Sequence, residues 1–224
     1  MDGRPTNILD DSFFLVYIYY EERMGPASKT DLKAKKILAA VRTILAQNGY
    51  MGTTITLVAK EAGVSRGLLH YYFKNKDEML ARVIKENMEI SIAMIFSVFD
   101  RYDTPKGYAK GITDLLRSVM ETDPDFLSLF FEGFAVARHS RIVNKELAML
   151  YGKFREALES CLKKAQNQEI ITPDLPVESL AAIITGMIDG MGLQLLTEPD
   201  LCQDLVIWES IEKAIIDLLC MDTC

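Results

Sequence analysis

The sequence of 224 residues predicts an all-α protein of about nine helices. Apolar residues recur at helical spacing through most of the chain beyond residue 29. The segments between these patterns are turn sequences, such as Asp103-Thr104-Pro105 and Glu198-Pro199-Asp200. Strand-like alternation and Gly-rich phosphate loops do not occur from residue 77 onward. These observations together favour a helical bundle.

The first helix is predicted over residues 35–45. The residues that share its apolar face are Ile37, Leu38, Val41, Ile44 and Leu45. Asn48-Gly49 then supplies the left-handed residue that commonly ends a helix. We therefore expect a helix with one apolar side that ends at this pair.

Two shorter helices are expected next. Thr53-Thr54 offers a side-chain oxygen that can cap a helix ending at Gly63, and Ser65 can cap another over residues 66–72. Only the corner Gly63-Val64-Ser65 separates the two helices. Two short helices joined by a tight turn containing Gly are the signature of a helix-turn-helix, which places its second helix in a DNA groove.

Charge is distributed unevenly along the chain. Residues 29–85 contain eleven Lys or Arg and four acidic residues, a net charge of +7, whereas residues 86–224 contain twelve basic and twenty-three acidic residues, a net charge of −11. The overall charge of −7 therefore hides a basic N-terminal module. Because a local basic face dominates affinity for phosphates, this module is predicted to bind nucleic acid.

A fourth helix is predicted to begin at Lys76. Asp77 and Glu78 occupy its first turn, where the helix dipole favours acidic side chains. A helix N-terminus with a lysine can hold a phosphate. The alternative is a charged turn between helices, and the basic charge of the surrounding module favours phosphate binding.

Several short motifs support this interpretation: Asn-Gly-Tyr at the end of the first helix, Thr-Thr before the second, Ala-x-x-Ala-Gly-Val-Ser through the turn, and the aromatic run 71–73 before Lys76 and Leu80. On these motifs, residues 33–80 resemble the DNA-binding domain of the TetR family of bacterial transcriptional regulators. The resemblance implies phosphate contacts from Thr54, Tyr71, Lys76 and the amide near Gly67. It implies base contacts from Thr56, Arg66, Leu68 and His70.

Two of these positions need separate comment. Arg66 is expected to contact guanine, because a guanidinium fits O6 and N7 of that base in bidentate fashion; the alternative is a solvated surface arginine. His70 stands where family members usually carry a tyrosine. The contact at position 70 is therefore left open.

Three segments make up the predicted domain organisation: an N-terminal extension over residues 1–28, a helix-turn-helix domain over residues 29–75, and a helical effector-binding and dimerisation domain over residues 76–224. We expect Met24 to be the natural start of the protein, since family members usually begin shortly before the first helix. The helices of the last domain are predicted at residues 76–99, 105–121, 124–140, 141–168, 177–196 and 203–221.

The last two helices are predicted to form a homodimer. The segment 177–196 is apolar nearly all round and contains small residues, and the final helix carries a second apolar stripe. The resemblance implies dimerisation through these helices, and the alternative is a helix pair inside a monomer. The residues expected at the interface are Leu180, Ile184, Met187, Met191, Leu195, Trp208, Ile211 and Ile215. Two-fold symmetry would require a palindromic double-stranded DNA operator.

The middle helices are predicted to hold a small-molecule effector, because aromatic and sulfur-containing side chains cluster there. Plain core packing is the alternative for each of them, and the resemblance favours a pocket. The residues expected to contact the effector are Phe96, Phe99, Met120, Phe130, Phe134, Arg138, Tyr151, Phe154, Met187 and Met191. By shifting the population of two orientations of the fourth helix, the effector is expected to change DNA affinity.

Residues 137–200 also resemble the C-terminal domain of BetI-like repressors, through Leu-Pro-Val-Glu-Ser-Leu-Ala-Ala and Asp-Gly-Met-Gly-Leu-Gln-Leu-Leu-Thr-Glu-Pro-Asp. Within this segment, Asp189 is interpreted as a helix-packing or interface residue and not as a ligand group. The physical reason is that an unpaired buried carboxylate would be costly.

Other functions are disfavoured. With only His70 and His139 the chain lacks a histidine pair at metal-binding spacing, and it lacks catalytic and nucleotide-binding motifs, so catalysis, cofactors and metals are not expected. Four cysteines without Cys-x-x-Cys spacing indicate a reducing cytoplasm, and the apolar run at 13–20 is too short for a membrane span. A ligand-responsive repressor is therefore predicted; the alternative is a helical interaction protein of the same fold without operator recognition.

Overall fold

The computed structural model describes residues 29–220, so the N-terminal extension and the proposed start at Met24 lie outside the described part. The described residues form nine α-helices and one short 3-10 helix without a β-strand, which confirms the predicted all-α class. The elements are α2 (Lys29–Gly52), α3 (Ile55–Ala62), α4 (Arg66–Tyr72), α5 (Lys76–Arg101), α6 (Pro105–Thr122), α7 (Pro124–Ala137), α8 (Arg141–Asn167), α9 (Val177–Thr197), η1 (Pro199–Gln203) and α10 (Leu205–Leu219).

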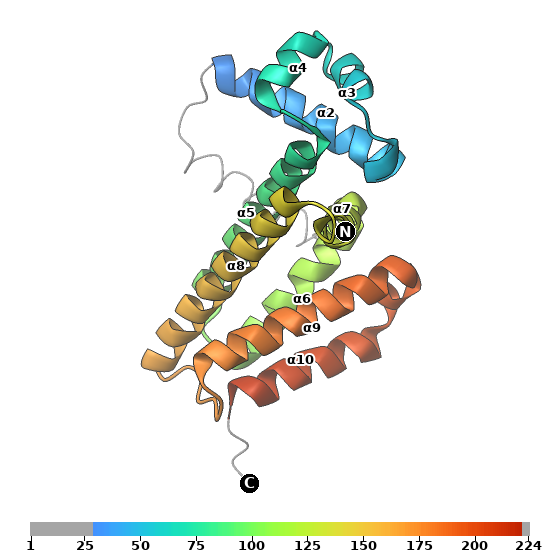
Figure 1. The fold of residues 1–224 in the computed structure, drawn as a ribbon. Coiled ribbons are helices and arrows are strands. Elements are labelled where there is room, and N and C mark those ends of the chain that lie inside the picture. Colours follow the sequence, from blue (N-terminus) through green and yellow to red (C-terminus); the bar gives the residue numbers. More distant parts are fainter. Residues whose placement is uncertain (1–28, 221–224) are drawn as a thin grey trace, which may run out of the picture.

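Helices α2, α3 and α4 form a small N-terminal head, drawn in blue to blue-green at one end of the molecule (Figure 1). Gly49 has φ 64 and ψ 173, so the regular part of α2 ends there, at the predicted position. Val41, Val58 and Leu69, one residue from each of these helices, are completely buried. They belong to an apolar core that continues into the body.

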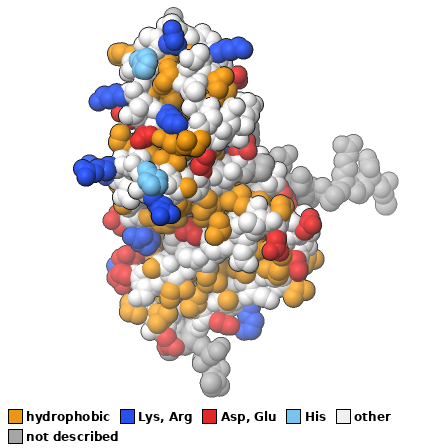
Figure 2. All heavy atoms as spheres, turned by 45° about the vertical axis from the view of Figure 1, so that its right-hand side comes forward, with side chains coloured by type: hydrophobic (Ala, Val, Ile, Leu, Met, Phe, Trp, Pro, Cys, Tyr) orange, Lys and Arg blue, Asp and Glu red, His pale blue; other side chains and the backbone are white. Residues whose placement is uncertain are grey.

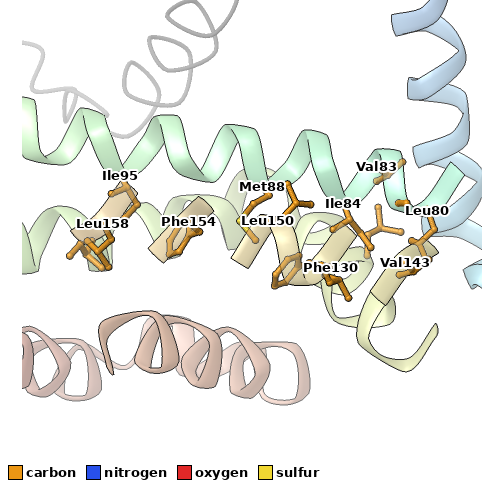
Figure 3. Packing of buried hydrophobic residues seen from close by; sticks show 14 of the residues in the cluster. Leu80, Val83, Ile84, Met88, Ile95, Phe130, Val143, Leu150, Phe154 and Leu158 are labelled. Carbon is orange, nitrogen blue, oxygen red and sulfur yellow. The ribbon is translucent and has the colours of Figure 1, made fainter. Parts of the chain in front are cut away.

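The larger body, residues 76–220, is built around α5 and α8, which lie side by side (Figure 1). The two helices run in the same direction, because their first turns are joined by a hydrogen bond from Ser140 to Asp77 and their ends by an ion pair between Lys164 and Asp100. Leucine and isoleucine side chains of α5 and leucine and phenylalanine side chains of α8 pack in the space between the two helices (Figure 3). Helix α5 thus belongs to the core of the body and also leads from it to the head.

Helices α9 and α10 complete the body. Helix α9 packs on α8 and α7, and α10 packs on α6. The predicted final helix 203–221 instead begins at Leu205, because the Asp204 carboxylate accepts hydrogen bonds from Val206 N and Ile207 N and so caps it there. Helix α9 is the one described helix that is long and apolar enough to cross a membrane by length and composition alone, and it is partly buried inside the protein.

Candidate nucleic-acid interface and effector cavity

Side-chain caps begin α3 and α4, and one glycine shapes the turn between them. The Thr54 hydroxyl accepts a hydrogen bond from Leu57 N at 3.2 Å, and the Ser65 hydroxyl accepts one from Leu68 N at 3.2 Å. Gly63 takes the left-handed conformation, φ 65 and ψ 38, and lets Val64 N reach Ala59 O at 3.0 Å. These local bonds set the angle between the helices of the predicted helix-turn-helix.

Helix α4 divides its residues between core and solvent. Leu69 is fully buried and Leu68 is half-buried, while Arg66, His70 and Tyr71 are exposed. Tyr71 is 81% exposed, and its ring meets that of Tyr72 edge to face at 5.5 Å between centres. The residues predicted to contact DNA from α4 thus lie together on one outer surface.

The glycine at the start of α4 is not required by packing. A Cβ atom added at Gly67 would meet no atom of the protein within 4 Å. A residue with a side chain could therefore occupy this place as far as the protein itself is concerned. The open space suits the close approach of another molecule to the backbone.

Thr54, the cap of α3, and Thr56, in its first turn, are both exposed. The Thr54 oxygen already accepts the capping bond, but its hydroxyl proton can still be donated to a phosphate. Both threonines therefore present a polar group to solvent.

Lys76 is held in place at the first residue of α5. Its Nζ donates to Tyr50 O at 3.2 Å and lies 4.1 Å from the centre of the Tyr50 ring. An ammonium group has three donors, so two remain for a phosphate. The N–H of Glu78, by contrast, is already used by the cap from Asn75, at 3.0 Å. A phosphate at this helix end would therefore rely mainly on the lysine.

The space-filling view shows lysine, arginine and histidine side chains spread over the head, and hydrophobic side chains gathered over the lower half of the body (Figure 2). This agrees with the count of basic residues in segment 29–85. The basic surface and the helix-turn-helix lie at the same end of the molecule.

The junction of head and body is a network of hydrogen bonds. Arg42 on α2 donates to Asn87 Oδ1 on α5 at 3.0 Å and forms an ion pair with Asp123, at 2.5 Å, at the start of α7. Asn87 is completely buried, and its Nδ2 lies 3.4 Å from Phe126 O on α7. One arginine of the head therefore holds two elements of the body.

A second part of the junction centres on Asp77. Its carboxylate accepts hydrogen bonds from the Tyr50 hydroxyl and from Ser140 Oγ, the latter at 2.6 Å. The bond from Ser140, followed by that from Tyr50, lowers the pKa of Asp77. Burial, with the neighbouring carboxylate, raises the pKa of Tyr50 to about 12. Tyr50 N also donates to Glu132 on α7, at 2.5 Å.

Within the body, a cavity of about 90 Å³ lies between α5, α6, α7, α8 and α9. Its walls are almost entirely apolar. The lining residues are Met88, Ser91, Met94, Ile95, Ile112, Leu115, Leu116, Val119, Phe126, Leu127, Phe130, Phe131, Tyr151, Phe154, Thr185, Ile188 and Asp189. A smaller cavity of about 10 Å³ lies next to it, between α6, α9 and α10.

The predicted effector contacts are only partly brought together. Phe130, Tyr151 and Phe154 line the main cavity, and Met187 and Met191 line the smaller one. The other five predicted residues line neither cavity: Phe96, Phe99, Met120, Phe134 and Arg138. Among these, the Phe99 ring is taken up by stacking on Tyr108, at 4.4 Å, and Arg138 is exposed beyond the end of α7.

Asp189 joins two helices and also borders the main cavity. Its Oδ2, on α9, accepts a hydrogen bond from the Tyr151 hydroxyl, on α8, at 2.6 Å. Burial raises the pKa of both side chains. The sequence interpretation rested on the cost of an unpaired buried carboxylate, and it could not include the bond from Tyr151, which lies 38 residues away in the chain.

Most residues predicted at the dimer interface lie on the inner faces of α9 and α10. The side chains of Leu180, Ile184, Leu195, Trp208 and Ile215 are all buried inside one protomer, where they pack against its own core. Because α9 is apolar on most sides, periodicity alone could not separate its inner face from its outer face. The outer face carries Ile183, Gly186, Gly190 and Leu193 on α9, and Leu205 and Val206 near the start of α10.

The fold and the exposed α4 surface define a helix-turn-helix regulator with a helical C-terminal domain. Residues 37–83 match the family of bacterial regulatory proteins called the tetR family, and residues 109–217 match the C-terminal domain of BetI-type transcriptional repressors. The chain belongs to the TetR family of transcriptional regulators, which are not enzymes. The resemblance drawn from the helix-turn-helix motifs is thereby confirmed.

Named relatives agree with this assignment. The chain is 26% identical to the uncharacterized HTH-type regulator YfiR of Bacillus subtilis, over 72% of this chain and 78% of YfiR. It is also 26% identical to the nicotine-responsive repressor HdnoR of Paenarthrobacter nicotinovorans, over 80% of this chain and 94% of HdnoR. Both are described as transcriptional regulators.

Solved structures share the fold. Salmonella enterica GusR superposes with a TM-score of 0.75 at 18% identity, covering 86% of this chain and 97% of GusR. Bacillus subtilis FadR, solved in complex with stearoyl-CoA, superposes with a TM-score of 0.67 at 21% identity, covering 82% and 97%. At these identities the similarity concerns the fold alone.

Proposed function

We propose that this regulator is a cytoplasmic repressor that binds a palindromic operator as a homodimer and releases it when a small molecule enters the main cavity. The DNA surface would consist of Arg66, Gly67, Leu68, His70 and Tyr71 on α4, with support from Thr54, Thr56 and Lys76. Arg66 would contact a guanine, and Lys76 a phosphate. Small-molecule control is also named for one relative, the nicotine-responsive HdnoR.

One observation carries the proposed control: Phe126 belongs to both the cavity and the junction. Its side chain lines the main cavity, while its carbonyl oxygen receives the Asn87 amide. Asn87 in turn accepts the hydrogen bond from Arg42 in the head. A molecule that shifts the first turn of α7 would therefore change contacts made to α2, and so the orientation of the head.

The homodimer is proposed through the outer faces of α9 and α10. Ile183, Leu193, Leu205 and Val206 are exposed apolar side chains there. Gly186 and Gly190 stand one turn apart, with no atom of the protomer within 4 Å of an added Cβ, so another helix can approach closely. Leu193→Glu should convert the dimer to a monomer in light scattering, whereas Met149→Glu, at an exposed position on α8, should not.

Gel shift on the DNA upstream of the protein's own gene tests operator binding. We expect a salt-sensitive complex. Arg66→Ala should relax the preference at one base pair at a cost of about 1–3 kcal/mol, and Lys76→Ala should weaken binding evenly across sequences. Lys153→Ala, on α8 away from the head, is the matched control.

The alternative, a helical interaction protein of this fold without operator recognition, follows from the histidine at position 70. His70 is exposed among the proposed base contacts. If the wild-type protein binds every duplex alike, and His70→Tyr creates a base preference that the wild type lacks, the alternative is correct and the repressor proposal fails.

A further inference from the structure

The polar groups of the main cavity do not all remain available to a ligand. The Thr185 hydroxyl donates to Ala181 O at 2.7 Å, and the Ser91 hydroxyl donates to Asn87 O at 3.1 Å, so both protons are used by their own helices. The pair formed by Tyr151 and Asp189 is what is left. Lysine, arginine and histidine are missing from the lining residues.

The negative charge of Asp189 is balanced by few neighbouring groups. Its one hydrogen bond among the described residues comes from Tyr151, and no ion pair to it is formed there. An ionised carboxylate can accept about four hydrogen bonds, so most of its capacity is unused. Burial without a cation raises its pKa, which records the cost of keeping the charge in this place.

The aromatic rings around the cavity, like the Asp189 carboxylate, favour a positively charged ligand. Phe126, Phe130, Phe131 and Phe154 line it together with Tyr151. The Phe130 and Tyr151 rings lie 5.7 Å apart between their centres, in a tilted arrangement. Since the face of an aromatic ring is negative, rings that line the same cavity as a carboxylate suit a positively charged ligand.

We infer that the effector is a compact apolar amine that binds in its ammonium form, with its nitrogen against Asp189 and its hydrocarbon part among the phenylalanine rings. This inference rests on the proposed function, because it names the ligand class of the same cavity. An ammonium ion supplies the positive charge and the N–H donors that Asp189 lacks. A carboxylate or phosphate would be repelled, and a neutral molecule would leave the charge unpaired.

The size of the cavity limits the ligand. About 90 Å³ is smaller than the roughly 150 Å³ of a cavity known to accept benzene, so a one-ring amine must displace wall side chains. Met88 and Met94 are in the wall and have flexible thioether chains that can rearrange. Phe126 lies in the same wall, so expansion of the cavity would reach the junction with the head.

Calorimetric titration of the full-length protein with three matched probes tests the inference. The probes are 2-phenylethylamine, 2-phenylethanol and phenylacetate at neutral pH, which carry an ammonium, a hydroxyl and a carboxylate on similar skeletons. The amine should bind about tenfold or more tightly than the alcohol, and phenylacetate more weakly still. Equal affinities, tighter binding of either other probe, or no binding of the amine would overturn the inference.

Three variants locate the effect. Asp189→Asn should bring the affinities for amine and alcohol to within about twofold. Tyr151→Phe keeps the carboxylate and should keep the preference for the amine. Glu178→Gln removes the same charge from the same helix at an exposed position, away from the cavity, and should behave as wild type. An Asp189→Asn protein that still prefers the amine to the alcohol would contradict the inference. If this variant does not fold, the affinities of the wild-type protein for the three probes decide the question.

Failure of this inference can be told apart from failure of the proposed function. If the protein binds its operator and is released by a neutral or anionic compound, the regulator is ligand-responsive and the amine assignment is wrong. If it binds no duplex selectively in gel shift, the repressor proposal fails whatever the calorimetry shows.

Discussion

Partly buried carboxylates occur in two places, at the junction of head and body and in the main cavity. The two places differ in the hydrogen bonds and cations that these carboxylates meet. At the junction, Asp123 is paired with Arg42, and Asp77 receives hydrogen bonds from two hydroxyls. In the cavity, Asp189 receives one hydrogen bond and has no cation beside it among the described residues. The pKa of Asp77 is lowered, whereas the pKa of Asp189 is raised.

The junction carboxylates therefore stabilise the fold, whereas we interpret the Asp189 carboxylate as a site for a positively charged ligand. A carboxylate whose lone pairs are satisfied stabilises the folded state when ionised. A carboxylate that lacks a cation costs free energy until a cation arrives. Opposite responses to mutation and pH are therefore expected from the two regions.

The largest expected effect is at the centre of the junction. Asn87→Leu would leave Arg42 and the Phe126 carbonyl without their shared partner, so we expect a loss of about 1–3 kcal/mol in the free energy of unfolding. Urea denaturation measures it. Asn144→Leu, the same change at an exposed position of α8, should alter stability by about 0.5 kcal/mol or less. Equal effects of the two variants would contradict the role given to Asn87.

The second effect concerns Asp77. Asp77→Asn should destabilise the protein at neutral pH by about 1 kcal/mol, a modest figure because the site is partly solvated. A depressed folded-state pKa stabilises above the unfolded value of 3.8, and this stabilisation is lost as the pH falls through the folded value. The difference between wild type and variant should therefore disappear in acid. Asp174→Asn, at an exposed position, should show no such dependence.

Asp189 should respond in the opposite sense. A raised folded-state pKa means that its favourable contribution is present below pH 3.8 and is lost as the pH rises through the folded value. Asp189→Asn should therefore stabilise the ligand-free protein at neutral pH, by no more than about 1 kcal/mol because the site keeps some contact with solvent. Urea denaturation at neutral and acid pH measures this, and destabilisation at neutral pH would show that the carboxylate is structural.

The smallest effect is expected where a carboxylate is paired in solvent. The exposed Lys163 contacts the half-buried Glu159 at 2.5 Å and the exposed Glu178 at 2.9 Å. Lys163→Met should leave the melting temperature unchanged within error in physiological salt, because water and ions already screen these charges. A clear drop would mean that pairing alone, without burial, explains the contrast between junction and cavity.

Local patterns in the chain made the helix-turn-helix predictable. Thr54, Gly63 and Ser65 act through bonds to residues three to five positions away, so their neighbours in sequence were sufficient to place α3 and α4. Leu69, on the inner side of α4, is fully buried. The boundaries of α4 agree with the predicted range 66–72.

The cavity was less predictable, because its walls come from five helices. Phe130 and Phe154 line it, whereas Phe99, which is also buried on its helix, is stacked on Tyr108 instead. Periodicity indicates that a side chain points inward but not which space it meets. The inner faces of α9 and α10 were mistaken for a dimer surface on the same ground.

The sequence by itself determined the all-α class, the caps of α3 and α4, the helix-turn-helix and the basic charge of the head, since each depends on residues close together in the chain. Only the tertiary structure decided that Arg42 would meet Asp123, that Tyr151 would bond to Asp189, and which face of α9 is left exposed. These pairings join residues 81 and 38 positions apart, and packing of whole helices, not local preference, brings them together.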